Sequence, residues 1–275
     1  MKTLTTAGVT ILPTPTGLRY IRTQLGMTQT SLAASLGLSY STINRWERNL
    51  YEPTRTNREM LEAFCRKRNI DYETIQVGMM LLQVVANLDQ YTAQHCFRVG
   101  ELVERISRNV PGINATDLKV AAILHDAGKI FVNPTLVKSR RIYDTNMRQR
   151  MAEHAPAGRV LLSLLMAKHP HAADFVDQHH CRLSGGPADR KISPEARLLA
   201  VCDVFDALTT ARSYKPAKTV ETAIAMLCAD KGLDQQMVSA LVRNLRRNGF
   251  LDALEDDNHL FVYDARDKFY RRRAA

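Results

Sequence analysis

The chain has 275 residues, of which 45% are apolar and 24% carry a charged side chain. These values are typical of soluble globular proteins, and the length allows one large domain or two ordinary ones. The formal net charge of +10 is unusual and favours an anionic partner, with nucleic acid as the first candidate and an acidic membrane surface as the second. A solvated basic surface without a dedicated partner is the alternative.

The cysteine pattern and the hydropathy argue against secreted and membrane classes. The five cysteines are widely spaced and form no CxxC pair, so they indicate neither a disulfide framework nor a thiolate zinc site. A reducing cytosol fits this usage best. The most apolar stretch, residues 75–85, is too short to cross a bilayer, and residues 1–13 have no apolar run of signal-peptide quality. We therefore expect a cytoplasmic protein without a membrane anchor.

Glycine, proline and polar breaks divide the chain into helical segments, and the sequence predicts an all-α fold. The apolar stretch 71–87 has helical spacing and predicts a connecting helix. Within the tail, residues 259–263 form either a short strand or an irregular docking segment. The expected organisation is an N-terminal helical domain over 1–70, the connecting helix over 71–87, a larger all-helical domain over 88–248 and a basic C-terminal tail over 249–275.

Residues 28–48 have the pattern of two short consecutive helices. Thr28 and Ser39 are each placed to cap a helix through the hydroxyl, and Gly37 ends the first helix without a side-chain penalty. Ile43 and Trp46 are three residues apart and would both face inward. The outward side of the second helix then offers hydroxyl, amide and guanidinium groups, which reading base edges in a major groove requires. These outward residues are Tyr40, Ser41, Asn44, Arg45 and Arg48.

The stretch from Met27 to Arg48 resembles the phage-repressor and Cro-like helix-turn-helix family, and the similarity covers about residues 17–66. The resemblance implies binding to double-stranded DNA as a homodimer, with the second helix in the major groove and Gln29 on the phosphate backbone. Residues 1–70 contain ten Lys or Arg against four Glu and no Asp, so +6 of the net charge lies here. A helical bundle used only for protein contacts is the alternative.

Seven of the eight histidines fall between His95 and His180. His169 and His171 flank Pro170 and are expected to be loop residues. The other five alternate with carboxylates, and imidazole with carboxylate suits divalent iron, manganese or zinc. One bridging Asp would hold two metals about 3.5 to 4 Å apart, the spacing of two-metal hydrolysis. A chance clustering of histidines is the alternative. In chain order the set is His95, His125, Asp126, His154, His179, His180 and Asp203.

The doublet His125-Asp126 resembles the signature of the HD phosphohydrolase superfamily, and further landmarks over about residues 80–248 resemble its HD-GYP branch. The landmarks are Asp89 to His95 with Arg98-Val99, Glu153-His154 with Gly158, His179-His180 with Arg182, Ala196 to Thr209, and Arg212 to Lys215. The resemblance implies two divalent metal ions, with iron or manganese favoured. By position, His95, His125, Asp126 and Asp203 would hold one ion, and Asp126, His154, His179 and His180 would hold the other.

The HD-GYP resemblance also implies catalytic and substrate-binding residues. His125, Asp126 and Lys129 would be catalytic, and Lys129 would meet substrate phosphate together with Arg182, Arg212 and Lys215. For Arg212 and Lys215 a solvated face is the alternative. Tyr91 stands where some relatives have a glutamate that supports a third metal, so we expect two. The Gly-Tyr-Pro loop of the family is altered here and reads Arg182-Leu183-Ser184-Gly185-Gly186-Pro187.

Together these patterns predict a DNA-binding regulator whose second domain hydrolyses a cyclic dinucleotide phosphodiester. The family typically hydrolyses cyclic di-GMP, which is the first candidate substrate, and another nucleotide phosphodiester is the second. A nucleotide-sensing repressor without turnover is a different class of function that the altered loop leaves open. An enzyme whose N-terminal domain only localises or dimerises it is a further alternative.

Overall fold

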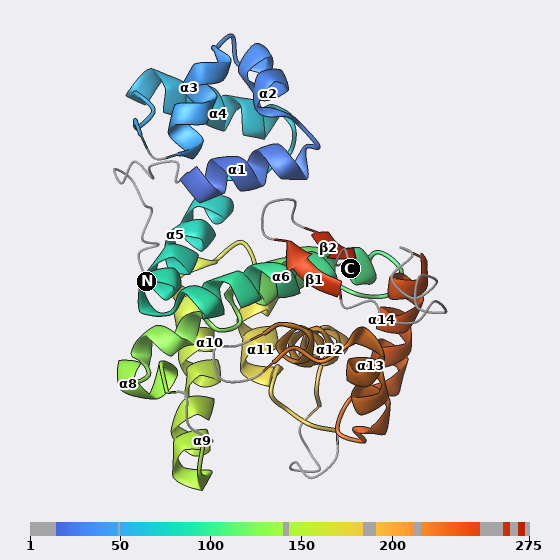
Figure 1. The fold of residues 1–275 in the computed structure, drawn as a ribbon. Helices are drawn as coiled ribbons and strands as arrows, with labels where there is room; N and C mark the ends of the chain where they lie inside the picture. Colours follow the sequence, from blue (N-terminus) through green and yellow to red (C-terminus); the bar gives the residue numbers. More distant parts are fainter. Residues whose placement is uncertain are drawn as a thin grey trace. The chain divides into compact units, whose positions relative to one another are not determined.

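The computed structural model describes residues 15–48, 50–139, 143–183, 191–211, 216–247, 261–264 and 269–272. The chain divides into two compact units, Met1–Gln83 and Val84–Ala275. Helix α5 (Tyr72–Leu88) contains the boundary between them, and it lies where the apolar stretch 71–87 predicted a connecting helix. Helices are the dominant element of both units, which confirms the all-α expectation (Figure 1).

The first unit is built from short helices that begin at hydroxyl caps. Thr28, Ser39 and Thr54 each accept a hydrogen bond from the amide three residues later, and each thereby satisfies one of the free amides of a first turn. Gly37 has a φ of +65° between two of these helices. The predicted caps and the glycine turn are therefore confirmed. The helices are α1 (Pro15–Gln24), α2 (Gln29–Ser35), α3 (Tyr40–Glu47), α4 (Arg55–Lys67) and the start of α5.

A small apolar core joins the helices of the first unit. Ile43 and Trp46 of α3 are buried, as their spacing predicted, and burying a large apolar side chain stabilises a fold by about 1.5–3 kcal/mol. Because these two residues fix which face of α3 points inward, its polar residues are left on the other side. The remaining buried members of this core are Leu18, Ile21, Leu32, Ala33, Leu36, Leu61, Phe64 and Cys65.

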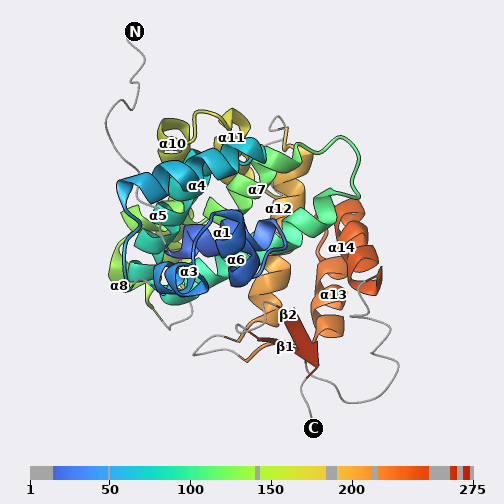
Figure 2. The same cartoon turned by 90° about the horizontal axis from the view of Figure 1, so that it is seen from above.

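Helix α12 (Pro194–Thr209) is the central element of the second unit. Figures 1 and 2 show it between α11 on one side and α13 and α14 on the other, and it also packs on α6 and α7. Leu198, Leu199 and Phe205 of α12 are fully buried. The other elements are α6 (Gln90–Ser107), α7 (Ala115–Leu124), the 3-10 helix η1 (Ala127–Phe131), α8 (Pro134–Val137), α9 (Thr145–Ala152), α10 (His154–Leu165), α11 (Pro170–Gln178), α13 (Val220–Ala229) and α14 (Gln235–Arg247).

A two-stranded antiparallel hairpin follows the helices. It consists of β1 (Phe261–Asp264) and β2 (Phe269–Arg272), with Phe261 opposite Arg272 and Asp264 opposite Phe269. Of the two alternatives that the sequence left for residues 259–263, the strand is therefore the one observed, and it begins at Phe261. Within the described part of the chain, no helix combines the length and the apolarity needed to cross a bilayer.

Candidate metal centre

Five histidines and two aspartates from distant parts of the chain meet inside the second unit. Donor atoms lie within 4.8 Å of one another in three groups, two of which contain His125. The exposed fraction of His125 is 1%, whereas His180 reaches the surface and Asp203 is half-buried. The structure thus brings together all seven residues of the predicted set. The three groups are His154, His179 and His180; His95, His125 and Asp126; and His125, His179 and Asp203.

Three of these histidines are oriented by the backbone. Nδ1 of His125, of His154 and of His179 each donates to the carbonyl oxygen three residues earlier, at 2.9 Å for His125 and 2.6 Å for His154. Since Nδ1 carries the proton, Nε2 keeps its lone pair and faces the centre. Nε2 of His125 is buried and has no hydrogen-bond partner among the described residues. A buried free lone pair beside carboxylates is suited to a divalent metal ion.

His95 is oriented by a carboxylate instead of a carbonyl. Its Nδ1 lies 2.7 Å from Oδ2 of Asp206 and its Nε2 lies 2.9 Å from Oδ1 of Asp203. Arg98 holds the same Asp206 carboxylate through two bonds of 2.7 and 2.8 Å. Burial lowers the pKa of His95, but the hydrogen bonds that His95 donates to both aspartates outweigh burial and raise the pKa to about 9. The sequence pattern alone did not indicate a role for Asp206.

Asp126 lies between the histidine groups. Its Oδ1 is 3.1 Å from Nε2 of His154, and its Oδ2 is 3.6 Å from Nε2 of His125. Lys129 donates to Oδ2 at 2.6 Å. Burial would raise the pKa of Asp126, but the charge of Lys129 and the contact with His154 outweigh burial and hold the pKa well below the usual range. The carboxylate is therefore ionised at neutral pH, as metal binding requires.

The imidazoles near Asp126 favour their neutral forms. Burial lowers the pKa of His125, and burial together with the neighbouring His180 lowers the pKa of His179 well below its usual value. Loss of hydration and the nearby His154 lower the pKa of His180 to about 4, although Asp203 acts in the opposite direction. A metal binds neutral imidazole, so these side chains are ready for a metal at pH 7.

Two glycines allow the backbone of η1 to approach the start of α10. A Cβ on Gly128 would overlap the carbonyl oxygen of His154 and would lie 2.5 Å from the backbone nitrogen of Gly158. A Cβ on Gly158 would lie 2.9 Å from Cγ1 of Val176. Only a residue without a side chain permits the crossing at position 128, and this crossing places Asp126 within reach of His154, whereas Gly158 also leaves room for Val176 of α11. In the sequence, Gly158 was recognisable only as a family landmark.

The predicted substrate-binding residues have different environments. Lys129 lies at the centre, bound to Asp126. Arg182 follows the two adjacent histidines, and its guanidinium pairs with Asp230 at 3.1 Å on the surface. Arg212 and Lys215 lie outside the described residues, as does the stretch 184–187 of the altered loop.

Two further histidines lie apart from the centre. His169 is 8% exposed, and its Nδ1 lies 2.8 Å from Oδ1 of Asp117. His171 belongs to the first turn of α11, which begins at Pro170. Our interpretation of His171 as a loop residue is therefore wrong. Proline is favoured at the first position of a helix, because the amide hydrogen that it lacks would have no partner within the helix there.

In the first unit, a buried carboxylate organises the residues around α3. Glu47 is 2% exposed, and Arg22 binds it through two bonds of 2.6 and 3.0 Å. Gln29 also donates to Glu47, at 2.8 Å, and accepts from Asn44 at 3.2 Å. Burial would raise the pKa of Glu47, but the bonds from Arg22 and Gln29 lower it. Asn44 and Gln29, both predicted to meet DNA, are thus positioned by a residue that the sequence analysis did not single out.

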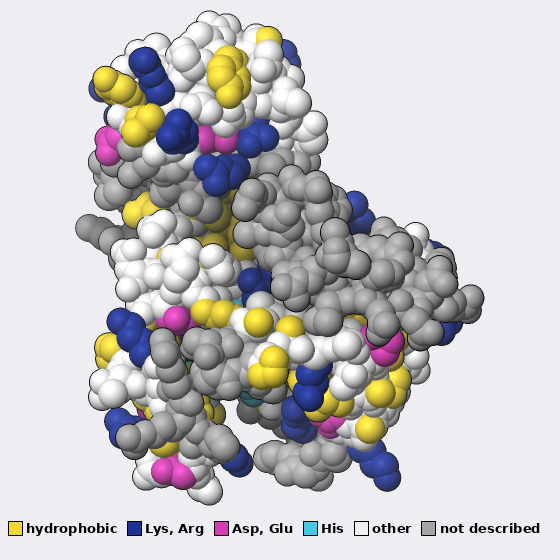
Figure 3. Space-filling model, in the orientation of Figure 1, with side chains coloured by type: hydrophobic (Ala, Val, Ile, Leu, Met, Phe, Trp, Pro, Cys, Tyr) yellow, Lys and Arg dark blue, Asp and Glu magenta, His cyan; other side chains and the backbone are white. Residues whose placement is uncertain are grey.

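The other predicted DNA-binding residues lie on the open side of α3. Tyr40 is 53% exposed, and the side chains of Ser41, Arg45 and Arg48 are also exposed. The guanidinium of Arg45 lies over the ring of Tyr51, 5.5 Å from its centroid. Figure 3 shows Lys and Arg side chains on the surface of the first unit. This exposed set offers the donors and the charge that a nucleic acid surface attracts.

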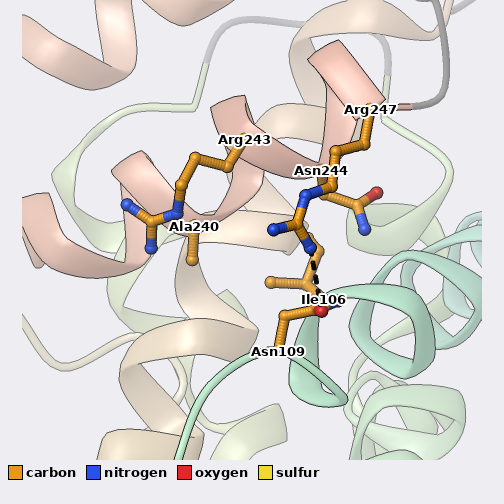
Figure 4. A pocket seen from close by; sticks show the side chains of 6 residues that line it. All are labelled: Ile106, Asn109, Ala240, Arg243, Asn244 and Arg247. Carbon is orange, nitrogen blue, oxygen red and sulfur yellow. Dashed lines mark hydrogen bonds between the residues drawn. The ribbon is translucent and has the colours of Figure 1, made fainter.

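A small cavity of about 120 Å³ lies between α6 and α14 (Figure 4). Asn109 and Asn244 each donate to the carbonyl oxygen of Arg105 at 3.3 Å, and Arg247 donates to Asn109 at 3.1 Å. These polar groups therefore close the C-terminal end of α6, and none of the predicted site residues lines the cavity. Its lining residues are Ile106, Asn109, Ala240, Arg243, Asn244 and Arg247.

Comparison with protein families agrees with this geometry. The model of the HD domain matches residues 76–237, which include all seven residues of the centre. The chain belongs to the HD domain family. A helix-turn-helix model matches residues 18–70, which include α1 to α4 except the first three residues of α1. The resemblances drawn from the sequence, to the HD superfamily and to the helix-turn-helix family, are thus confirmed.

Relatives of the HD domain include enzymes that act on cyclic dinucleotides. The cyclic di-GMP phosphodiesterase response regulator RpfG of Xanthomonas campestris pv. campestris is 37% identical over 46% of this chain and 35% of its own length. The 3'3'-cGAMP-specific phosphodiesterase 1 of Vibrio cholerae is 25% identical over 62% of this chain and 42% of its own length. The chain thus spans less than half of either relative. The solved HD domain of the L. monocytogenes phosphodiesterase PgpH is 18% identical, with a TM-score of 0.45 over 64% of this chain and 99% of that one.

Proposed function

We propose that the HD domain of this protein is a metal-dependent phosphodiesterase that hydrolyses a cyclic dinucleotide. The observation that carries the proposal is the set of five histidines and two aspartates around the unpartnered Nε2 of His125. The named activities of the relatives RpfG and the 3'3'-cGAMP-specific phosphodiesterase support the same reaction type.

The mixture of imidazole and carboxylate donors fits two divalent ions, and the HD-GYP resemblance favours iron or manganese. Asp126 is the residue that both ions would share, because its two oxygens face different histidines, His125 and His154. When bound, a pair of such ions lowers the pKa of a shared water and stabilises the leaving oxygen of the phosphodiester. We assign His95, His125, Asp126 and Asp203 to one ion and Asp126, His154, His179 and His180 to the other.

Lys129 supplies a fixed positive charge at this set. Its ammonium lies 2.6 Å from the Asp126 carboxylate, and partial burial weakens the screening of its charge by water. A phosphodiester carries one negative charge, so an ammonium at this position would orient the phosphate and neutralise a non-bridging oxygen. Arg182, on the surface next to the paired histidines, is a second candidate contact. Arg212 and Lys215 remain substrate-binding candidates on the sequence pattern alone.

Cyclic di-GMP is the first candidate substrate. RpfG is named for this substrate, and the 3'3'-cGAMP-specific phosphodiesterase 1 is named for another cyclic dinucleotide. The altered loop that follows Arg182 is the reason to test other nucleotides beside cyclic di-GMP, and a nucleotide-sensing domain without turnover is the second candidate function.

For the helix-turn-helix unit we propose binding to double-stranded DNA as a homodimer. Helix α3 would enter the major groove with Tyr40, Ser41, Asn44, Arg45 and Arg48, and Gln29 would meet the phosphate backbone. The exposure of Tyr40, Ser41, Arg45 and Arg48 and the positive charge of residues 1–70 support the proposal. The whole protein would then be a regulator in which nucleotide chemistry and DNA binding occur on one chain.

The test is a hydrolysis assay on the full chain loaded with iron(II) or manganese(II). Cyclic di-GMP and a panel of other cyclic dinucleotides are offered, with the double variant His125→Ala/Asp126→Ala as the control. Turnover of one substrate that disappears in the double variant would establish the enzyme and identify its substrate. Tight nucleotide binding by the metal-loaded protein without any product would replace the enzyme by the nucleotide-sensing repressor.

A further inference from the structure

We propose that Asp206 is a positioning residue that sets the metal affinity of the His95 side of the centre. The inference rests on the metal site of the proposed function and adds to it a residue that touches neither metal nor substrate. Asp206 is 0% exposed and accepts hydrogen bonds from His95 and from Arg98. The same aspartate therefore fixes one predicted ligand and balances one buried cation.

The helical spacing on two facing helices explains this contact. Asp203 and Asp206 are three residues apart on α12, and His95 and Arg98 are three residues apart on α6. Residues at this spacing lie on the same face of a helix. Where α6 packs on α12, His95 meets both aspartates, at 2.9 and 2.7 Å, and Arg98 meets the second. Asp203, on the Nε2 side of the ring, is thus available for the metal, while Asp206 lies on the Nδ1 side of the ring.

A carboxylate behind an imidazole acts differently from a carbonyl. His125, His154 and His179 donate Nδ1 to backbone carbonyls, which carry only a dipole. His95 donates Nδ1 to a full negative charge, which fixes the tautomer and also makes Nε2 a stronger donor to a metal. The ring of His95 is further held by Tyr91, which lies parallel at 6.3 Å between centroids with 6° between planes. We therefore expect the ion on the His95 side to depend on Asp206.

Because Arg98 is a buried cation next to His95, metal binding on the His95 side requires the negative charge of Asp206. Its side chain is 4% exposed, and its guanidinium sits on the carboxylate that holds His95. With Asp206 in place, the two charges cancel. Without that negative charge, the guanidinium of Arg98 would lose the carboxylate it binds beside a metal ligand, and its charge would disfavour the incoming cation more strongly, because charges in a low-dielectric interior are poorly screened.

A purely structural clamp between α6 and α12 is the competing explanation, so the experiment must separate positioning from stability. Metal-free full-length protein is titrated with manganese(II) by calorimetry, as wild type, as Asp206→Asn and as Asp117→Asn. Asp117 is the matched control, because it is a buried aspartate that also pairs with a histidine Nδ1, at 2.8 Å, and its partner His169 is not among the metal-donor groups found in the described residues.

The expected result is that Asp206→Asn weakens the binding of one ion by about 10- to 100-fold and leaves the other ion unchanged. Asp117→Asn should leave both affinities at the wild-type values. Two ions bound by Asp206→Asn with wild-type affinity would overturn the inference. Equal weakening of both ions would also overturn it, because that is the signature of a general structural defect. Failure of the wild type to bind metal would instead overturn the proposed function, and the inference with it.

If Asp206→Asn does not fold, as judged by circular dichroism, the same titration is made with Asp206→Glu. This variant keeps the negative charge beside Arg98 but moves the carboxylate by one methylene, so the hydrogen bond to His95 is displaced. Weaker binding of one ion alone is again the expected result, and unchanged binding of both ions would overturn the inference.

Discussion

The two units present their polar side chains in opposite ways. In the helix-turn-helix unit, the predicted contact residues lie within one stretch, 29–48, and most of them face solvent. In the HD domain, the predicted ligands extend from His95 to Asp203, and five of the seven are at most 3% exposed. Exposed polar groups are satisfied by water, whereas buried ones require partners from the protein. A buried site therefore depends on supporting residues, such as Asp206, for most of its polar groups, whereas in the exposed site Glu47 supports only Gln29 and, through it, Asn44.

The largest expected effect comes from Gly128→Ala, which tests whether the buried site depends on one backbone crossing. Its Cβ would meet backbone atoms of His154 and Gly158, which cannot move aside as a side chain can. We expect a loss of at least about 4 kcal/mol in unfolding free energy and loss of metal binding. Denaturant unfolding and metal titration measure these effects.

Gly100→Ala is the matched control for that substitution. It adds a Cβ that meets chiefly the flexible side chain of Ile123, at 2.6 Å from Cγ1, so a smaller loss of about 1–3 kcal/mol is expected. Equal effects of the two substitutions would show that the crossing has no special importance for the centre.

The next largest effect tests whether the exposed site also has a buried support. Glu47→Ala leaves Arg22, 16% exposed, without its carboxylate, and breaking a buried pair in this way costs about 3–5 kcal/mol. Glu62→Ala, which removes an exposed helical pair with Arg66, should cost less than about 1 kcal/mol. Thermal unfolding measures both losses, and metal binding by the HD domain should be unchanged. Reduced metal binding in Glu47→Ala would contradict the independence of the two units.

Asn44→Ala tests the exposed surface itself. An amide that reads a base edge contributes about 1–3 kcal/mol, so DNA affinity should fall about 10- to 100-fold while folding is kept. Arg66→Ala, on the exposed side of α4, serves as the control for a general loss of contact. Affinity is measured by fluorescence anisotropy at several salt concentrations, because phosphate contacts make binding weaker as salt rises. Unchanged affinity in Asn44→Ala would remove α3 as the reading helix.

The pH dependence of metal binding tests the protonation state of the buried site. With a pKa of about 9, His95 is protonated at pH 7 and must release a proton before it can bind a metal. Manganese affinity on the His95 side should therefore rise by roughly tenfold per unit between pH 7 and 9 and then level off. His180, with a pKa of about 4, is already neutral and adds no dependence in this range. Calorimetry at each pH measures the manganese affinity. An affinity that does not change between pH 7 and 9 would be evidence against a protonated His95.

The sequence was sufficient for features that depend on local geometry. The caps at Thr28 and Ser39 and the inward face of Ile43 and Trp46 follow from the spacing within one helix, and the structure has them as predicted. The histidines and aspartates of the centre were selected by their order and by family resemblance, and the structure brings them together.

The sequence was insufficient where a partner comes from a distant helix. In the sequence, Glu47 cannot be distinguished from an exposed charged residue. Its burial is explained by its pairing with Arg22, 25 residues away. Asp206 reads as part of a motif, and its role depends on Arg98 and His95, more than 100 residues away. The i, i+3 spacing of His95 with Arg98 and of Asp203 with Asp206 was the available signal, but it indicates a shared face without naming the opposite helix. Composition likewise did not place the division at Gln83, because α5 continues through it.

The carbonyls that orient His125, His154 and His179 belong to Ala122, Met151 and Val176. A carbonyl oxygen is present whatever the side chain, so mutation at these three positions leaves the orienting bonds in place as long as the helix ends keep their course. Substitutions around the centre can therefore change the side chains that line it and its entrance while the imidazole rings keep their orientation. A change of substrate specificity is therefore possible without any change in the backbone bonds that orient these three histidines.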